Sequence, residues 1–537
     1  MSVQPAVSER APATQERSPP LALVLPRPES PKWNILGLRF YLPVRTRFLF
    51  SIAAGLSWAG FSTWIALGWI EELGRAVTLP GAIAVIAGVA IVPGYLNIQL
   101  AVSLLSDKPR PLSFDHECPG VTLLIAAYNE EAQIRETIEY ALGQDYAGPL
   151  EIVVADDGST DRTREVALGT TADSRVRVVT TPHAGKSEAL NAVLRTVQSP
   201  LVATIDADTL LMPYALRHAV ARMLCSPPDT VAVAGSVLVR NSRANVLARI
   251  QEWDYFLAIA SVKRQQALFQ GTLVAQGAFS VYRTSAVQRV GGWPNRIGED
   301  IVLTWALIRD GGRTVFEPTA IAFTQAPVKL RHFVRQRQRW ARGMIEGLRT
   351  HGHGLLGSRR MYVHSVAANC LFPYLDTVYT IAVPTGIVLA LTGNFLIVGP
   401  MTAAVLPISL TIALTMLVRQ RTMAANALRA ALSELGIVAA QGYEGLRELM
   451  TRLEEPSEEI PENMRCALLL LAKQWQALDV DERVLERQIG KAARGDRDAR
   501  RLMEVPSVGP IIASTVLAKV PDATVFRADA ILRPGSG

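Results

Sequence analysis

Two long apolar runs near the start of the chain restrict its possible folds more than any other feature. One covers Phe48–Ile70 and the other covers Leu79–Leu105. Each is long enough to cross about 30 Å of hydrocarbon as a helix. Hydrophobic residues make up 49% of the chain and charged residues only 19%, which also favours membrane segments. We therefore expect a transmembrane helical hairpin over residues 45–110.

The charges around these runs predict their orientation. Basic residues lie outside the pair and acidic residues lie between the two runs: Arg45, Arg47, Lys108 and Arg110 outside, and Glu71 and Glu72 between. The positive-inside rule places both outer flanks in the cytoplasm. The polar stretch after Arg110 is therefore expected to be cytoplasmic.

A second apolar block runs from about Val366 to Val418 and is interrupted near Gly393. It predicts a second transmembrane hairpin over residues 361–418, and its prolines predict kinks: Pro373, Pro384, Pro400 and Pro407. The alternative is a buried core hairpin of a soluble protein. Two such pairs on either side of one polar domain make that alternative the weaker one.

Residues 1–44 are rich in Pro, Ser, Glu and Arg and show little apolar periodicity. They carry no basic segment followed by an apolar core, so they do not resemble a cleavable signal. We expect a disordered cytoplasmic tail. The four cysteines are far apart, which disfavours a zinc site or disulfide framework and fits a reducing compartment: Cys118, Cys225, Cys370 and Cys466.

Residues 111–350 form a polar block in which short β-branched runs alternate with amphipathic stretches. Strands are expected at 121–127, 150–155, 175–180 and 201–205, with helices at 130–142 and 187–197. This βαβ series predicts an α/β domain with a mainly parallel, Rossmann-like sheet covered by helices. In such sheets, ligands bind beyond the carboxyl ends of the strands.

Acidic residues stand at those strand ends. Asp156 and Asp157 end the second strand, and Asp206 and Asp208 end the fourth. Alternate residues of an extended chain point the same way, so Asp206 and Asp208 can face one ion. Their hard oxygen atoms suit Mg²⁺ or Mn²⁺. The alternative is a solvated turn between strand and helix.

Three further segments carry candidate chemistry. Lys186 stands at a helix start where it could meet a phosphate; a complete P-loop is excluded, because that pattern needs glycine where Thr180 stands. Asp300 opens an amphipathic helix and is either a general base or a charge at the helix N-terminus. The basic segment 331–342 is amphipathic and could also lie on anionic lipid.

Together these residues resemble the family 2 glycosyltransferases of the processive, membrane-integrated kind, which include cellulose, chitin, hyaluronan and poly-N-acetylglucosamine synthases. The resemblance covers roughly residues 45–418. The matching segments occur in the family's order: residues 127–130 (AYNE), 156–159 (DDGS), 185–186 (GK) with 189–191 (ALN), 206–208 (DAD), 298–300 (GED) and 336–340 (QRQRW).

The resemblance implies a GT-A fold, an inverting mechanism and a role for each matching residue. Asp300 would be the catalytic base. The nucleotide-sugar would be bound by Ala127, Tyr128, Asn129, Glu130, Asp156, Asp157, Lys186 and Asp206. Asp206 and Asp208 would hold the metal ion. The acceptor and diphosphate would be contacted by Glu299, Gln336, Arg337, Arg339 and Trp340.

The implied reaction is transfer from a UDP-sugar, UDP-N-acetylglucosamine or UDP-glucose, to a growing polysaccharide at the bacterial inner (plasma) membrane, with membrane lipids around a multi-pass chain. One departure is Gly298, where the family often has threonine; another is that no gating-loop motif of the cellulose synthases is found. Enzymes that glycosylate a lipid acceptor once share much of this motif set, so single transfer is the alternative.

Residues 419–537 have a different character. They predict an all-α segment with a long helix over Met464–Arg494 and a helix-hairpin-helix near 505–520. This segment resembles the C-terminal half of insertion-sequence transposases, without their RNase-H-like part. We expect a transposase-like remnant fused to the enzyme, and an inactive fusion that only binds nucleotide is a further alternative. No dense basic face is visible, so nucleic acid is not an expected partner.

Overall fold

The computed structural model describes residues 33–35, 38–40, 43–106, 111–170, 172–255, 261–269, 271–356, 360–397, 418, 421–422, 424–433, 435–440, 442–455, 460, 462–495, 497–504 and 509–510. The chain divides into a small unit, residues 1–41 with 108–111, and a large unit that holds the rest. In the small unit, β1 (Trp33–Ile35) pairs antiparallel with β2 (Leu38–Phe40). This hairpin departs from the disorder predicted for residues 1–44; residues 1–32 lie outside the described residues.

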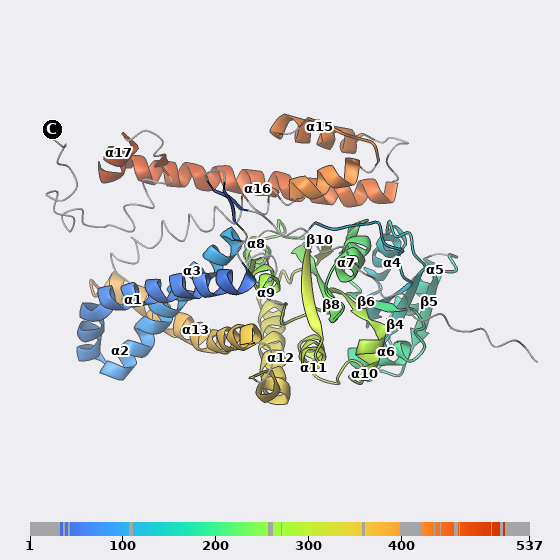
Figure 1. Cartoon of the computed structure of the whole chain (residues 1–537), viewed down its shortest axis with the longest axis horizontal. Coiled ribbons are helices and arrows are strands. Elements are labelled where there is room, and N and C mark those ends of the chain that lie inside the picture. Colours follow the sequence, from blue (N-terminus) through green and yellow to red (C-terminus); the bar gives the residue numbers. More distant parts are fainter. Residues whose placement is uncertain are drawn as a thin grey trace, which may run out of the picture. The chain divides into compact units, whose positions relative to one another are not determined.

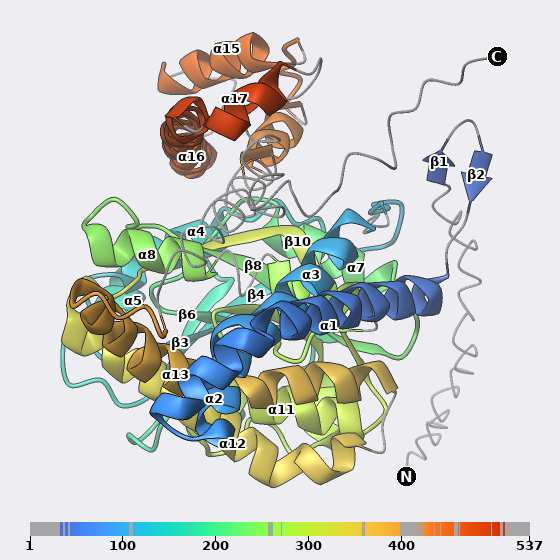
Figure 2. The same ribbon diagram turned by 90° about the vertical axis from the view of Figure 1, so that its left-hand side faces the viewer.

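Three helical segments of the large unit are long and apolar enough to cross a membrane, over Val44–Ala76, Leu79–Leu105 and Val363–Leu391. The first is α1 (Val44–Ala76). The second joins α2 (Leu79–Ile86), the π-helical turn η1 (Ala87–Ile91) and α3 (Val92–Leu105). Figure 2 shows α1 running alongside α3. The predicted first hairpin is thus built from two antiparallel apolar segments.

The third segment belongs to α13 (Arg360–Leu391), which continues through both Pro373 and Pro384. It ends just before Gly393, whose φ of +84° lies in the left-handed region that favours glycine. This is the interruption that the sequence indicated. The other half of the predicted second hairpin, with Pro400 and Pro407, lies outside the described residues.

An eight-stranded sheet follows the first hairpin (Figure 1), with the order β5-β4-β3-β6-β9-β8-β10-β7. Its strands are β3 (Val121–Ala127), β4 (Leu150–Asp156), β5 (Val176–Thr180), β6 (Leu201–Asp206), β7 (Leu210–Leu211), β8 (Thr230–Val239), β9 (Phe279–Arg283) and β10 (Arg313–Thr324). The four predicted strands, β3 to β6, pair in parallel. β8 and β10 are also parallel, whereas β9 is antiparallel to β6 and β8, and β7 to β10.

Helices cover both faces of the sheet, because its central strands are apolar on both sides. One face packs against α4 (Ile134–Leu142), α5 (Thr163–Gly169) and α7 (Ala215–Leu224). The other face packs against α6 (Lys186–Leu194), α10 (Thr284–Arg289) and α11 (Glu299–Arg309). Along β3, Leu123 and Ile125 face the first layer, whereas Leu124 faces the second.

Three helices connect this domain to the apolar segments: α8 (Val246–Tyr255), α9 (Lys263–Leu268) and the basic α12 (Leu330–Leu356). α12 packs against α11 and α13. It therefore links the helix that begins at Glu299 with an apolar segment.

The C-terminal part contains α15 (Tyr443–Glu454), α16 (Glu462–Gly495) and α17 (Arg497–Met503). Buried residues of this part, such as Leu432 and Leu468, belong to the same apolar cluster as α4 and α7. The Tyr214 hydroxyl also donates to the Ala431 carbonyl oxygen at 2.8 Å. The long predicted helix is confirmed by α16, whereas the predicted helix-hairpin-helix lies almost wholly outside the described residues.

Candidate active site

The strand ends that carry the predicted site residues lie at one edge of the sheet. Ala127 pairs with Asp156 across β3 and β4, and Ala126 pairs with Asp206 across β3 and β6. The parallel register thus brings together residues about 30 to 80 positions apart in sequence.

The turn after β3 is fixed to the loop after β4. Asn129 adopts a φ of +56°, which asparagine tolerates better than most residues. Its side-chain oxygen accepts from the Thr160 amide at 2.8 Å, and its own amide donates to the Ser159 hydroxyl at 3.0 Å. The Glu130 amide donates to the Thr163 hydroxyl at 2.7 Å. Because residues 130–133 form this turn, α4 begins at Ile134 and not at the predicted residue 130.

Asp157 organises the loop that leads to α6. Its buried carboxylate accepts from the amides of Ala184 and Gly185 at 2.9 and 3.0 Å. It also lies 2.9 Å from His183 Nδ1. The His183 ring stacks on Tyr128, with centroids 4.2 Å apart and planes inclined by 17°. Tyr128 is 41% exposed, so this aromatic pair borders open space beside the strand ends.

His183 was not among the predicted site residues. It stands three residues before Lys186 in the segment that was compared with a P-loop. The sequence signal for His183 was an aromatic, titratable side chain between a predicted strand and a segment that partly matches a phosphate-binding loop.

Asp156 is 1% exposed. One carboxylate oxygen accepts from the Ser159 amide at 3.0 Å, and the other has no hydrogen-bond partner among the described residues. A buried acceptor without a partner is costly. Asp156 therefore has an acceptor atom available for a ligand N–H.

Lys186 connects two predicted parts of the site. Its Nζ atom lies 2.6 Å from Asp206 Oδ1 and 3.2 Å from Glu299 Oε1. Burial lowers the pKa of Lys186, but Asp206 and Glu299 outweigh it, so the net pKa is raised and the ammonium stays charged. A Cβ atom at Gly277 would lie 2.7 Å from this Nζ, so a larger residue there would require the ammonium group to shift.

Asp206 and Asp208 provide the candidate metal site. Asp208 accepts hydrogen bonds from the hydroxyls of Thr324 at 3.2 Å and Thr209 at 3.3 Å. Burial and the neighbouring Asp206 raise the pKa of Asp208, and this repulsion is what a divalent cation relieves. Within the described part of the chain, no group of three or more His, Cys, Asp or Glu side chains is arranged to hold a metal ion. A bound cation would therefore need further oxygen ligands, which a diphosphate offers.

Glu130 faces the same charges. Burial, followed by Asp208, Asp206 and Asp161, raises the pKa of Glu130 to about 7. The Glu130 carboxylate, in the turn after β3, therefore interacts electrostatically with Asp206 and Asp208 at the end of β6.

Asp300 lies in the first turn of α11, as predicted. Its Oδ1 atom accepts from the Ile301 amide at 2.8 Å, and its Oδ2 atom accepts from the Gly277 amide at 3.3 Å. Glu299 stands beside it, with a pKa that burial raises and Lys186 opposes.

The basic helix α12 places the remaining predicted residues. Arg337 forms an ion pair with Asp254 and lies over the Trp340 ring at 4.3 Å. Trp340 lies 5.8 Å from the ring of Tyr255. The carbonyl oxygen of the Gln336 side chain is buried without a hydrogen-bond partner among the described residues, whereas Arg339 is exposed. Asp254 and Tyr255 were not predicted as site residues. Tyr255 is 7% exposed, and burial, together with the charges of Asp208 and Asp206, raises the pKa of its hydroxyl.

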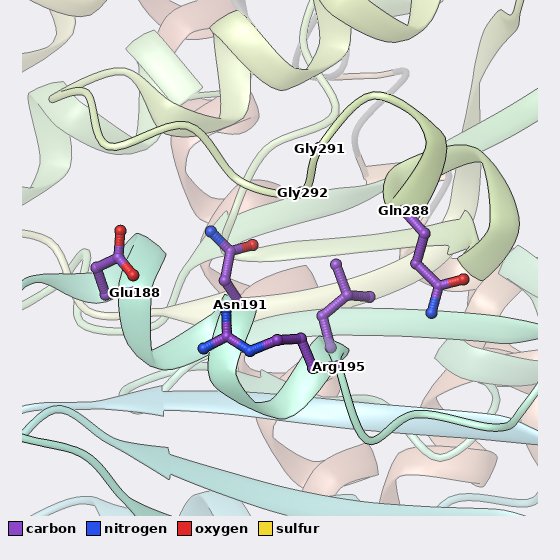
Figure 3. Close-up of a pocket in the computed structure, with 7 residues that line it drawn as sticks. Glu188, Asn191, Arg195, Gln288, Gly291 and Gly292 are labelled. Carbon is purple, nitrogen blue, oxygen red and sulfur yellow. The ribbon is translucent and has the colours of Figure 1, made fainter.

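An open pocket of about 400 Å³ lies elsewhere, between α6 and the loop after α10 (Figure 3). None of the predicted site residues lines it. Asn191, on its wall, binds both the amide and the carbonyl oxygen of Trp293, at 2.8 and 2.7 Å. Asn191 thus anchors the loop that leads to Glu299 and Asp300.

Comparison with known proteins agrees with this geometry. Residues 119–343 match the protein family described as glycosyltransferase like family 2. Poly-beta-1,6-N-acetyl-D-glucosamine synthase of Staphylococcus aureus is 32% identical over 256 residues, which are 47% of this chain and 61% of that protein. An N-acetylglucosaminyltransferase of Mesorhizobium japonicum is 31% identical over 265 residues, 46% of this chain and 62% of that protein. The chain thus covers less than two thirds of the length of either relative.

Among solved structures, a mannosyltransferase from Pyrobaculum calidifontis in complex with GDP-Man and Mn²⁺ shares 20% identity, with a TM-score of 0.46, over 73% of this chain and 97% of that one. The segment that matches the protein family, residues 119–343, contains every predicted site residue, from Ala127 to Trp340. Residues 119–343 therefore form a domain that matches the family 2 glycosyltransferases.

Proposed function

We propose that this protein transfers a sugar, with inversion, from a UDP-sugar to a growing polysaccharide at the cytoplasmic face of the bacterial inner membrane. The observation that carries the proposal is the Lys186 bridge between Asp206 and Glu299. It holds the acidic end of β6 next to the start of α11, where Asp300 stands. A donor-binding group and a candidate base thereby share one site.

The residues of this site divide into donor and acceptor groups. Asp156, Asp157 and the Tyr128–His183 stack would hold the nucleotide base, whose ring nitrogens and flat face suit a carboxylate and an aromatic ring. The Asp300 carboxylate would take the proton of the acceptor hydroxyl as that oxygen attacks the anomeric carbon. The bond from this carbon to the diphosphate oxygen breaks, and UDP leaves with the electron pair.

Asp206 and Asp208 would hold Mg²⁺ or Mn²⁺ together with the diphosphate. The mutual repulsion of these two carboxylates favours the binding of such a cation. When bound, the cation neutralises the charge that develops on the leaving diphosphate. Lys186 adds a fixed positive charge beside it, and Gln336, Arg337, Arg339 and Trp340 would contact the acceptor and the diphosphate.

The choice of sugar rests on the relatives, whose names state N-acetylglucosamine. We therefore favour UDP-N-acetylglucosamine over UDP-glucose. The orientation rests on the basic residues beside the apolar segments, Arg45 and Arg47. A single transfer to a lipid acceptor would use the same donor site.

The test is UDP release by membranes that contain the full chain, with Mg²⁺ or Mn²⁺ and a panel of UDP-sugars. We expect release with one sugar, and a loss of about 10²–10⁴-fold in Asp300→Asn, because a positioned base contributes that much. The length of the product separates polymer synthesis from single transfer. UDP binding without release for every sugar would contradict the proposal and favour an inactive fusion.

Asp310→Asn is the matched control. Asp310 ends the same helix and pairs with Arg289 at 2.6 Å on the surface. Exposed ion pairs contribute about 0–1 kcal/mol, so this variant should keep full activity. Equal losses in both variants would indicate damage to α11 and not the removal of a base.

A further inference from the structure

Helix α8 has two faces of opposite character. Its buried face, on the side of the sheet, consists of Ala248, Gln251, Glu252 and Tyr255. On the other face, Val246 is 72% exposed and Ile250 is 56% exposed. With Trp253 these residues follow the spacing i, i+4 and i+7, which places them on one side of a helix. The apolar stripe of α8 is therefore turned away from the domain on which the helix packs.

This stripe continues onto α3, the end of the second membrane-length segment. Trp253, one turn after Ile250, packs against Leu100 and Leu104. Because α3 ends at Leu105, Leu100 lies about 8 Å from that end, at 1.5 Å per residue. Amphipathic helices that lie on a bilayer bury their apolar face to a similar depth, at the boundary of headgroups and acyl chains. If α3 crosses the membrane, the stripe of α8 thus lies at the membrane surface.

The segment that leads into α12 extends the exposed apolar face of α8. The side-chain amides of Asn245 and Gln251 donate to the carbonyl oxygens of Val328 and Pro327, each at 2.8 Å. Apolar side chains are exposed on both of these adjoining segments, and we call them the apolar surface: Val246, Ile250, Val328, Leu330 and Val334. Single exposed apolar residues are common, whereas a group on adjoining segments is typical of a surface that binds a membrane or another protein.

The charges around the apolar surface are basic. Four exposed cationic side chains accompany it on the same two segments: Arg249, Lys329, Arg331 and Arg335. The two carboxylates of α8 are paired, Glu252 with Arg243 at 2.7 Å and Asp254 with Arg337. Basic residues around apolar ones suit a bilayer that contains anionic headgroups. This charge pattern, together with the continuity with α3, favours lipid over a protein partner.

We propose that α8 and the start of α12 form a docking surface for anionic lipid, with the apolar surface inserted below the headgroups and the basic residues among them. The inference goes beyond sugar transfer and needs only that α3 crosses the membrane. Asp254 and Tyr255 belong to the same helix and contact Arg337 and Trp340 of α12. Lipid contact therefore holds this part of the candidate acceptor site at the bilayer surface.

The test places a fluorescent amino acid at position 250 of the full chain, reconstituted in nanodiscs of phosphatidylcholine with or without phosphatidylglycerol. One quencher is a phosphatidylcholine that carries a nitroxide near the headgroup end of its acyl chain, and the other is iodide in the water. We expect the lipid quencher to remove most of the emission and iodide to have little effect. The readout does not depend on activity, so it stands even if the protein releases no UDP.

Position 168 is the matched control. Leu168 is also apolar and 57% exposed, but it lies on α5, which packs on β4 and β5, the strands at the edge of the sheet away from β10. Here we expect quenching by iodide and not by lipid. Position 250 behaving like position 168 would overturn the proposal. Protection of position 250 from both quenchers would also overturn it, because the surface would then be covered by protein, such as a second copy of the chain.

The role of charge is tested by the combined variant Arg249→Gln, Lys329→Gln and Arg331→Gln. In the wild type, phosphatidylglycerol should increase lipid quenching at position 250, because the anionic headgroups attract these side chains. In the variant, quenching should be the same in both lipid mixtures. A control with the same net charge replaces three exposed arginines elsewhere with glutamine and should behave as the wild type: Arg135, Arg164 and Arg195. A wild type insensitive to phosphatidylglycerol, or a control that loses the sensitivity equally, would overturn the assignment to anionic lipid.

Discussion

Gly298 and Gly343 lie in direct backbone contact, where the start of α11 meets α12. A Cβ atom on Gly343 would lie 2.7 Å from the Gly298 Cα atom, a distance that real Cβ atoms essentially never show. The family resemblance implies threonine at position 298, and the close approach gives the glycine found there a physical reason. It brings the helix that bears Asp300 against the helix that bears Gln336 and Trp340.

Gly343→Ala should therefore destabilise the protein. In an unhindered helix, this change stabilises by about 0.5–1 kcal/mol, but here the added methyl group overpacks a backbone contact, which typically costs about 1–3 kcal/mol. We expect a lower unfolding midpoint and a loss of UDP release larger than the loss of UDP binding. Gly169→Ala, at the end of α5 with no atom near the added carbon, should not lower the midpoint and should leave UDP release unchanged. A Gly343→Ala variant as stable as the wild type would show that the two helices separate without cost.

Lys186→Met should weaken nucleotide binding more than it weakens folding. The variant leaves Asp206 and Glu299 without their shared cation, and hydrogen bonds to charged groups contribute about 1.5–3 kcal/mol each. We expect UDP affinity to fall roughly ten- to hundredfold, as measured by equilibrium dialysis with metal present. Unchanged affinity would remove Lys186 from the donor site.

His183→Ala should weaken binding of the whole nucleotide and should not alter the choice of sugar. The ring stacks on Tyr128 and lies 2.9 Å from the Asp157 carboxylate, and both residues are far in the chain from the candidate base Asp300. Aromatic pairs contribute about 0.5–1.5 kcal/mol beyond burial, so a severalfold loss of UDP affinity is expected. Competition between UDP-sugars provides the readout, and a changed sugar preference would place His183 near the sugar instead.

The stability of the metal-free protein should rise as the pH falls from about 7 to 5. Burial and acidic neighbours raise the pKa of Glu130 to about 7 and also raise that of Asp208. The native state therefore binds more protons than the unfolded state over this range. Glu130 and Asp208 destabilise the native state above pH 7, where they are charged, and this destabilisation is lost below about pH 5, where they are protonated. Unfolding midpoints with and without Mn²⁺ would check this, because the cation should stabilise most at the higher pH. Glu130→Gln should flatten the metal-free profile, and an unaltered slope in that variant would contradict the assignment.

Deleting residues 418–537 should lower the unfolding midpoint of the glycosyltransferase domain. Leu432, Leu449 and Leu468 are buried in the cluster that also contains α4 and α7, and Tyr214 would lose its partner Ala431. Leu432→Ala in the full chain is the smaller version of the change, with an expected cost of about 2–5 kcal/mol. If the deletion left the midpoint unchanged, the segment would be a passive addition, as expected for a fused remnant.

Local sequence patterns were sufficient to predict the elements that carry the candidate donor site. β3, β4 and β6 are continuous apolar runs that end in polar or acidic residues, and a run of this kind specifies both a buried strand and the place where it stops. Once these strands pair in parallel, their register places Asp156 and Asp206 at the same edge of the sheet. The start of α11 was also local, because Glu299 and Asp300 suit a helix N-terminus.

Only the tertiary structure decided the rest. β9 lies between β6 and β8 and is antiparallel to both, an arrangement that depends on pairing between distant segments and leaves no periodic signal in β9 itself. Tyr255 reaches the site because α8 lies beside α12, where its ring is 5.8 Å from that of Trp340, although it reads in the sequence as an ordinary helical position. A side chain's type and periodicity are properties of the local chain, whereas its charge environment is set by whichever distant residues fold against it.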